Sequence, residues 1–598
     1  MDILVRRVSP HYGRIKACGF ARTAGIACNK TLARVSSRRN LDNLRKVHCQ
    51  VWRSCEVSGV QVEKTLMGDH NPFFLLTGAT AMTFGRLLSV STAAVMIAAS
   101  CQLTDAQTPV VQPVPEYHLS DSVAPPSIQP VTEATDQKAA SSSEKDAEEQ
   151  KKKEAEAKKK LKEKFTGTYK PLYFDNDFSY LCDPLNDNFV IGDRLKNISN
   201  AGLVKIDMGG EYRYRYHNES NHRGLGLTGV DDEFNLHRTR IFANAKVGQN
   251  FRLYGEFIDA ESNGENFAPR LIEVNRADML NLFVDATLME GSGSDLTLRV
   301  GRQELLYGDQ RVVSPLDWAN TRRTFEGAKL AWKSDDTSID TFWTNPVRIS
   351  PNSFDSPDRD QEFMGTYASR KMAPGTTGDF YMLRYLNGRG ANDFEYNTAG
   401  TRWNGTFGEL LWLTEGAYQF GRNTDGSDHA AGATTVGLGR TMSQAQSKPT
   451  LWLYYDWASG DNDLGAGNGY HDNFPLGHKY LGFMDLFGRR NIKDINLMFT
   501  SSPSQKLKLL AWYHYFSLAN SGDSPYNIVG TPFNGGNAPG SSDLGHEIDL
   551  MATWNINARN NVVFGYSHFF SGNYYGTTAG TPFQGDASFY YLQYSVNF

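Results

Sequence analysis

The chain ends in the stretch Tyr590-Tyr-Leu-Gln-Tyr-Ser-Val-Asn-Phe598, which alternates at every position. One set of alternate residues is aromatic or aliphatic, and the other set is mostly polar. Successive side chains of an extended strand point to opposite sides, so a period of two predicts a β-strand. The apolar set is Tyr590, Leu592, Tyr594, Val596 and Phe598, and the other set is Tyr591, Gln593, Ser595 and Asn597.

The same alternation recurs upstream, in the runs 204–217, 238–247, 280–288, 507–515 and 547–556. The apolar faces carry aromatic residues near the strand ends, and the polar faces are ionic in strand after strand. A soluble half-buried sheet also alternates, but its packed core does not explain so many ionic faces. A last strand ending in Phe resembles the assembly signal of bacterial outer-membrane β-barrels. The resemblance implies that the apolar face meets lipid while the polar face lines a lumen.

We therefore predict an all-β fold, a transmembrane antiparallel β-barrel over residues 203–598. This region has 396 residues, and at roughly 22 residues per strand and loop it gives about 18 strands, with 16 and 20 as the even neighbours. A barrel of this size leaves room for an aqueous channel. The Gly/Asn/Asp/Pro-rich stretches 421–447, 459–480 and 519–545 are predicted to be extracellular loops.

Composition and charge argue against a helical membrane protein and a nucleic-acid-binding protein. Hydrophobic residues make up 40% of the chain, and no run reaches the roughly 20 apolar residues of a spanning helix. Net charge is −5, and residues 1–81 carry 13 Lys and Arg against 5 Asp and Glu. The rest of the chain is therefore acidic, which argues against nucleic acid as a partner. Cys182 is the only cysteine after Cys101, so we expect an ordinary unpaired residue there.

The first third of the chain is predicted to hold a secretion signal and a linker to the barrel. Residues 82–106 have the basic start and apolar middle of a secretory signal peptide, with cleavage expected after Ala106. A lipobox-like alternative would lipidate Cys101. Residues 1–81 are interpreted either as sequence upstream of the true start at Met82 or as a long basic leader, and in both cases they lie outside the fold.

Residues 107–165 combine a Pro/Ser-rich linker with a Lys/Glu-rich arm. Ala, Glu and Lys favour helix, and opposite charges recur three and four residues apart. We interpret the arm as a solvated helix or a disordered spacer. The other interpretation is an arm that touches peptidoglycan or a periplasmic export partner. Residues 166–202 are expected to be a periplasmic lead-in to the barrel.

Three blocks of the barrel region form distinctive motifs. The most specific is the block 299–330, with Gly-Arg-Gln-Glu-Leu at 301–305. The others are 455–491, with Tyr-Asp-Trp-Ala-Ser-Gly-Asp at 455–461, and 545–570, with Gly-His-Glu-Ile-Asp-Leu at 545–550. These motifs are similar to the signature of the alginate-export family of 18-stranded outer-membrane porins. The resemblance implies an outer-membrane porin that passively conducts an anionic or polar carbohydrate, such as an alginate-like polysaccharide or oligosaccharide, through an Arg-lined lumen.

An anion in a pore needs cationic groups that replace its lost hydration, and the planar Arg fork binds carboxylates well. Candidates for the lumen follow from strand parity, and a second group lies in a loop that could fold inward as a constriction. Inward-facing Asp207, Glu211, Asp285, Glu547 and Asp549 depart from a simple cationic pore, so the substrate stays generic. The lumen candidates are Arg213, Arg215, Arg238, Arg240, Arg299, Lys329, Arg384 and Arg402, and the constriction candidates are Asp309, Arg311, Arg322 and Arg323.

Two other functions are a structural anchor and a hydrolase. A structural outer-membrane anchor would tie the barrel to the cell wall through its Lys/Glu arm. An outer-membrane hydrolase would need a nucleophile beside a base, but Ser567 and His568 are neighbours in a strand and must face opposite ways. We expect no catalytic residues and no cofactor. We also expect no metal, because the acidic loop Asp461-Asn-Asp463 lacks the glutamate of an EF-hand calcium site. The expected partners are membrane lipid, lipopolysaccharide and, through the strand ending at Phe598, the barrel-assembly machinery.

Overall fold

The computed structural model describes residues 151–153, 155–156 and 169–598, except 185, 187–189, 201, 225, 292, 465–466 and 582. The signal peptide, the leader and the Pro/Ser linker expected from the sequence lie outside the described residues. Of the Lys/Glu-rich arm, the described residues 151–153 and 155–156 are helical and exposed. Among all described residues, no helix is both long and apolar enough to cross a membrane.

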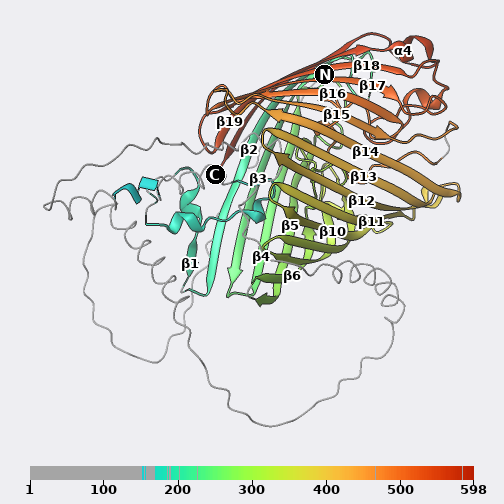
Figure 1. The fold of residues 1–598 in the computed structure, drawn as a ribbon. Coiled ribbons are helices and arrows are strands. Elements are labelled where there is room, and N and C mark those ends of the chain that lie inside the picture. Colours follow the sequence, from blue (N-terminus) through green and yellow to red (C-terminus); the bar gives the residue numbers. More distant parts are fainter. Residues whose placement is uncertain are drawn as a thin grey trace, which may run out of the picture. The chain divides into compact units, whose positions relative to one another are not determined.

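Within the described residues, eighteen antiparallel strands close into a barrel (Figure 1), which confirms the predicted fold and strand number. The ring runs from β2 to β8 and from β10 to β20, and it closes where β20 pairs with β2. Two short strands, β1 and β9, pair antiparallel with β2 and β8 outside this ring. The bounds are β1 Ile198–Asn200, β2 Val204–Ser220, β3 Asp232–Val247, β4 Phe251–Asn263, β5 Asn275–Gly291, β6 Ser294–Gln303, β7 Phe325–Ser334, β8 Thr337–Arg348, β9 Ser356–Pro357, β10 Gln361–Ala373, β11 Thr376–Asn387, β12 Phe394–Phe407, β13 Leu410–Arg422, β14 Asp428–Thr441, β15 Thr450–Ala458, β16 Ile492–Ser501, β17 Leu507–Leu518, β18 Asp543–Asn555, β19 Asn560–Ser571 and β20 Ala587–Asn597.

From residue 169 onward, the described helical turns are short and lie outside the strands. They are the 3-10 turns η1 Tyr173–Asp175, η2 Ser179–Cys182, η3 Asp193–Leu195, η4 Gly390–Asn392, η5 Gly477–Lys479 and η6 Phe533–Gly536, and the α-helix α4 Asn573–Thr577. Cys182, at the end of η2, is disulfide-bonded. This corrects the expectation of an unpaired residue, which rested on its isolation in the sequence.

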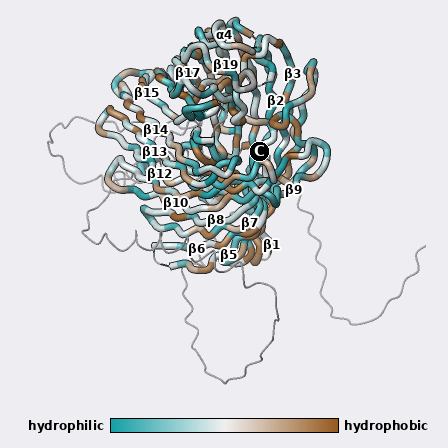
Figure 2. The backbone as a smooth tube through the Cα atoms, turned by 90° about the vertical axis from the view of Figure 1, so that its right-hand side faces the viewer, coloured by the Kyte–Doolittle hydropathy of each residue, from teal (hydrophilic) through white to brown (hydrophobic). Residues whose placement is uncertain are grey.

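The strands alternate as their sequence predicts (Figure 2). In β20, Tyr590, Leu592 and Tyr594 are exposed on the outer face, whereas Tyr591 and Ser595 are buried on the inner face. The register fixes this assignment, because a slip of one residue would turn every side chain to the other face. The apolar outer wall and the polar inner wall are therefore properties of the sequence itself.

Loop length divides the barrel into two ends. Short turns, such as 248–250 and 335–336, lie at the end where β2 begins and β20 finishes. Long connections, among them 304–324, 459–491 and 519–542, lie at the other end. The predicted loop 421–447 is wrong, since β14 occupies most of it. Its Ala, Gly and Thr residues alternate too weakly in hydropathy to show a strand in the sequence.

Candidate functional site: the filled lumen

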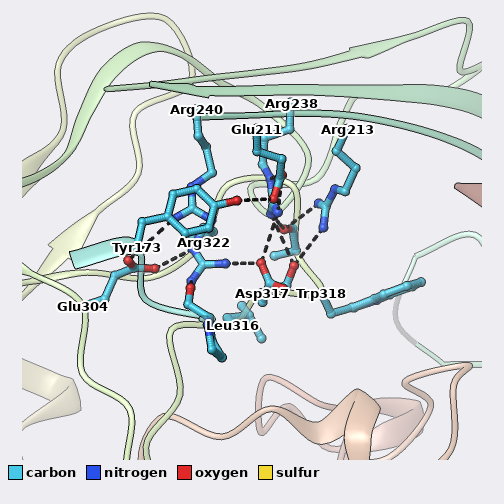
Figure 3. A network of polar contacts seen from close by, with 12 residues as sticks. Tyr173, Glu211, Arg213, Arg238, Arg240, Glu304, Leu316, Asp317, Trp318 and Arg322 are labelled. Atoms are coloured by element: carbon cyan, nitrogen blue, oxygen red, sulfur yellow. Dashed lines mark hydrogen bonds and ion pairs between the residues drawn. The ribbon is translucent and has the colours of Figure 1, made fainter. Parts of the chain in front are cut away.

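The loop of residues 304–324, between β6 and β7, folds into the lumen and is held there by arginines of the wall (Figure 3). Arg213 of β2 donates to the backbone oxygens of Asp317 and Ala319, both at 3.0 Å. Arg238 of β3 donates to the Ala319 oxygen at 3.1 Å and pairs with the Asp317 carboxylate at 3.1 Å. The arginines that sequence parity placed in the lumen thus serve first as a clamp on this loop.

The loop backbone departs from ordinary geometry at three residues. Gln310, Leu316 and Arg322 have positive φ angles of 68°, 55° and 63°. Non-glycine residues adopt this left-handed conformation at an energetic cost, and it persists only where surrounding contacts determine it. Such contacts are present, because Arg322 is buried and its guanidinium binds Glu304 at 2.5 Å and also Asp317.

A second loop, residues 459–491 between β15 and β16, meets the first one inside the barrel. Val313 and Phe474 form a parallel β-bridge, in which the Ser314 N–H donates to the Phe474 oxygen at 2.8 Å. The rings of Trp318 and His478 stack with their centres 3.6 Å apart. We call the two loops, 304–324 and 459–491, the septum, since together they cross the lumen between opposite walls.

Carboxylates of β18 hold the second loop. The Met484 N–H donates to Glu547 at 2.9 Å, and the Phe483 N–H donates to Asp549 at 3.3 Å. The sequence predicted 459–480 only as an extracellular loop and missed its inward course. The available signal was the pair of inward-facing acids, Glu547 and Asp549, which needed partners from outside their own strands.

Two cavities lie on opposite sides of the septum. A cavity of about 400 Å³ at the long-loop end is lined by Arg215, Trp318 and Arg323, among others. A cavity of about 640 Å³ at the short-turn end is lined by Arg299, Lys329 and Asp340, among others, together with septum residues 304 and 306–309. We call them the outer and the inner cavity.

Most of the lumen candidates lie on the inner wall of the barrel. Arg213, Arg215, Arg238, Arg240, Arg299 and Arg402 are buried there, and Lys329 lines the inner cavity. The predicted lumen position of Arg384 is wrong. In β11 this side chain lies on the outer face with Phe380 and Met382, and it pairs with Glu395 at 2.9 Å. Asp309, Arg311, Arg322 and Arg323 all lie in the septum.

Most of these cations are neutralised by carboxylates. Their ion pairs are Arg238 with Glu211 at 2.7 Å, Arg240 with Glu256 at 2.5 Å, Arg299 with Asp285 at 2.7 Å, Arg402 with Asp309 at 2.5 Å and Asp379 at 2.7 Å, Lys329 with Asp340 at 2.8 Å, and Arg311 with Asp309 at 3.6 Å and Asp456 at 3.7 Å. Two of the acidic residues that depart from a simple cationic pore, Glu211 and Asp285, are partners in these pairs. Glu547 and Asp549 instead accept from the second septum loop.

Three of the candidate arginines, Arg213, Arg215 and Arg323, make no ion pair with a carboxylate in the described part of the chain. Arg213 binds the septum oxygens already named, and its remaining partner is the Asn320 amide oxygen. Arg215 donates to Gln593 at 2.8 Å and to the Trp318 oxygen at 3.0 Å. Arg323 donates to the oxygens of Ser314 and Pro475. Burial lowers the pKa of Arg323 to about 10, so it stays charged at neutral pH.

The other chemistry considered from the sequence finds little support in the geometry. Ser567 is buried on the inner face, whereas the Nδ1 atom of its neighbour His568 lies 2.8 Å from the Ser588 hydroxyl. The two side chains therefore cannot act as nucleophile and base for each other. Across the residues that the structure describes, no group of three or more His, Cys, Asp or Glu side chains could hold a metal ion.

A sequence profile described as "Alginate export" matches residues 204–584. The chain belongs to this family. The match covers the whole barrel up to the loop before β20. The resemblance drawn from the motifs at 299–330, 455–491 and 545–570 is thereby confirmed, and no curated protein matches the chain.

Several solved structures are similar to the barrel in fold. Acinetobacter baumannii OccAB1 has 11% identity and a TM-score of 0.46, over 66% of this chain and 96% of that one. Pseudomonas aeruginosa OccD3 (OpdP) has 11% and 0.45, over 65% and 91%. Pseudomonas aeruginosa OprD has 10% and 0.42, over 65% and 93%. At these identities and scores, the functional conclusion rests on the family and on the residues themselves.

As a member of the alginate export family, the protein is an outer-membrane porin. Its outer wall contacts membrane lipid. Bacterial barrels of this kind have short periplasmic turns and long extracellular loops. The inner cavity therefore opens on the periplasmic side and the outer cavity on the extracellular side.

The outer cavity is expected to respond to pH through Asp472. Burial raises the pKa of its carboxyl to about 7, although Arg489 and Arg323 oppose the rise and Glu415 adds to it. Asp472 therefore stays neutral below about pH 7, and its ionisation above that pH adds a negative charge beside Arg323. Stability contributed by the neutral form is present below the unfolded pKa of about 3.9 and declines as pH rises towards the folded value.

We expect the preference for anions to be higher at about pH 6 than at about pH 8. Reversal potentials measured in planar bilayers across a KCl gradient test this expectation. The variant Asp472→Asn should keep the low-pH preference at both values. An Asp472→Asn variant with the full pH dependence of the wild type would show that another group is responsible.

Proposed function

We propose that this porin conducts an anionic carbohydrate, of the uronate type, by passive diffusion. The supporting observation is that Arg215 and Arg323 line the outer cavity without a carboxylate partner. Uncompensated cations in a narrow, low-dielectric passage attract anions and replace part of their hydration shell. Guanidinium groups also match the geometry of carboxylates.

The rest of the outer cavity suits a sugar ring. Trp318 supplies aromatic surface, and Asn473 and Asn527 supply amide donors and acceptors. Hydroxyl groups of a carbohydrate both donate and accept hydrogen bonds, so mixed amide groups are appropriate partners. The cavity therefore combines charge for a carboxylate with contacts for a pyranose ring.

The partners expected from the sequence fit this proposal. The barrel-assembly machinery would recognise the strand that ends at Phe598, and lipopolysaccharide would surround the extracellular half of the wall. The Lys/Glu-rich arm would reach peptidoglycan or a periplasmic export partner.

Replacing both free cations should weaken anion selectivity. In the variant Arg215→Gln/Arg323→Gln, we expect the permeability ratio of chloride to potassium to fall several-fold, since two uncompensated charges leave the passage. Block of the current by a polyuronate should weaken in parallel, while a neutral polymer of equal size should act on both proteins alike. Reversal potentials and current block in planar bilayers measure these effects.

The matched control is Arg422→Gln, which removes an exposed cation paired with Asp393 at 3.3 Å on the barrel rim. Surface pairs of this type contribute little, so selectivity should remain that of the wild type. If the double variant keeps the selectivity and the polyuronate block of the wild type, the anionic substrate class is wrong.

A further inference from the structure

A stretch just before the barrel lies inside its periplasmic end. We call residues 169–182 the entry segment. Leu172, Tyr173, Phe174, Phe178 and Tyr180 are buried against inward-facing aromatic side chains of β3, β4 and β5. These partners are Phe242, Tyr254 and Phe283, which form the receiving surface on the wall.

Ring contacts join the two sides. The ring of Phe174 lies with its centre 5.2 Å from that of Phe283 and 5.6 Å from that of Tyr254, in edge-to-face geometry. The Arg299 guanidinium lies 4.4 Å from the centre of the Phe174 ring. Such contacts add to the burial of apolar area. The segment is thus packed, although it forms no strand with the wall.

Polar contacts connect the entry segment to the clamp that holds the septum. The Tyr173 hydroxyl donates to Glu211 at 2.7 Å and lies 2.9 Å from the Asn597 amide oxygen. Glu211 is also the ion-pair partner of Arg238, which binds septum residue Asp317. Figure 3 shows Tyr173 beside these groups.

A direct contact to the septum also exists. Arg322, one of the strained septum residues, donates to the Pro171 oxygen at 3.3 Å. Leu172, Phe174 and Asp175 line the inner cavity together with septum residues. The entry segment therefore narrows the inner cavity and contacts the septum at the same time.

From these contacts, we infer that the entry segment is an autoinhibitory plug. While it is seated, it fills part of the inner cavity and supports the clamped position of the septum. When it leaves the receiving surface, the inner cavity widens, and Glu211 and Arg322 each lose one hydrogen-bond partner. Its attachment through side chains, without a strand ladder, makes it the separable part of the lumen filling.

Single-channel recording of the full-length protein in planar bilayers with KCl tests the plug. In the variant Tyr173→Ser/Phe174→Ser, which loses both rings and the hydroxyl contacts, we expect at least a twofold higher conductance. The chloride-to-potassium ratio should not change, because Arg215 and Arg323 are untouched. A change in conductance without a change in selectivity thus separates this inference from the proposed substrate class.

The control is Phe354→Ser, an aromatic residue that is 74% exposed in the connection between β8 and β10. Its conductance should equal that of the wild type. Heat-modifiable migration in detergent gels shows whether each variant is folded. If the double variant does not fold, Tyr173→Phe keeps the ring and loses only the hydroxyl contacts, and it should open more often. A folded variant with wild-type conductance and opening frequency would overturn the plug.

Discussion

Replacing Arg240 with leucine should lower the free energy of unfolding by about 3–5 kcal/mol, the usual loss when one partner of a buried ion pair is removed. Arg240 lies 2.5 Å from Glu256 and 3.9 Å from Glu304, and the side chains of all three are at most 1% exposed. Without Arg240, Glu256 would be left as a buried charge with no cation in contact. Urea unfolding in micelles, followed by tryptophan fluorescence, measures the loss.

A second substitution separates charge from packing. In Arg240→Leu/Glu256→Gln, the unpaired charge is gone, so most of the lost stability should return. The matched control is Arg370→Leu, since Arg370 is half exposed and its partner Asp336 lies 4.0 Å away. That change should stay within about 0.5 kcal/mol of the wild type. If Arg240→Leu and Arg370→Leu were equally stable, Arg240 would not be an essential counter-ion.

Removing the first septum loop should raise the single-channel conductance about threefold or more, since an empty barrel of this size holds an aqueous channel. Gln303 of β6 and Phe325 of β7 are direct partners in the sheet, so a short Gly-containing turn can replace residues 304–324 without moving either strand. Planar-bilayer recording measures the conductance. Anion preference should fall as well, because Arg323 is removed with the loop.

The control for this deletion removes residues 352–354, which are exposed in the connection between β8 and β10. It shortens a loop without touching the septum, so its conductance should remain that of the wild type. If the loop-deleted barrel folds and conducts no more than the wild type, the first septum loop does not limit the current.

Strand parity identified the inner wall wherever that wall is polar, and it failed where the septum makes the wall apolar. In β11, the inward-facing residues Leu383 and Tyr385 join a cluster with Phe474 of the septum. Both faces of this strand are therefore apolar, and alternation does not show which one is inside. Strand parity assigned Arg384 to the lumen, whereas its register with the exposed Phe380 and Met382 turns it outward.

The acidic partners of some wall arginines could not be predicted from the sequence, for a different reason. Arg402 finds Asp309 across 93 residues and Arg238 finds Asp317 across 79 residues, in each case through a loop that folds inward. A period of two describes strands and contains no information about loop paths. The acids were visible in the sequence, but the pairings with Asp309 and Asp317 depend on the septum. The sequence therefore could not single out Arg215 and Arg323 as the cations without a carboxylate partner.

The seam between β2 and β20 has a consequence for biogenesis. The last residue is part of the wall, because Phe598 and Gly210 exchange two backbone hydrogen bonds, each of 2.9 Å. The strands β2 and β20 must therefore find each other across almost the entire barrel sequence, and the wall cannot close before β20 has been secreted. A chain truncated by one strand would keep two open sheet edges, which are templates for aggregation. Completion of translocation thus becomes a checkpoint that a prematurely ended polypeptide cannot pass.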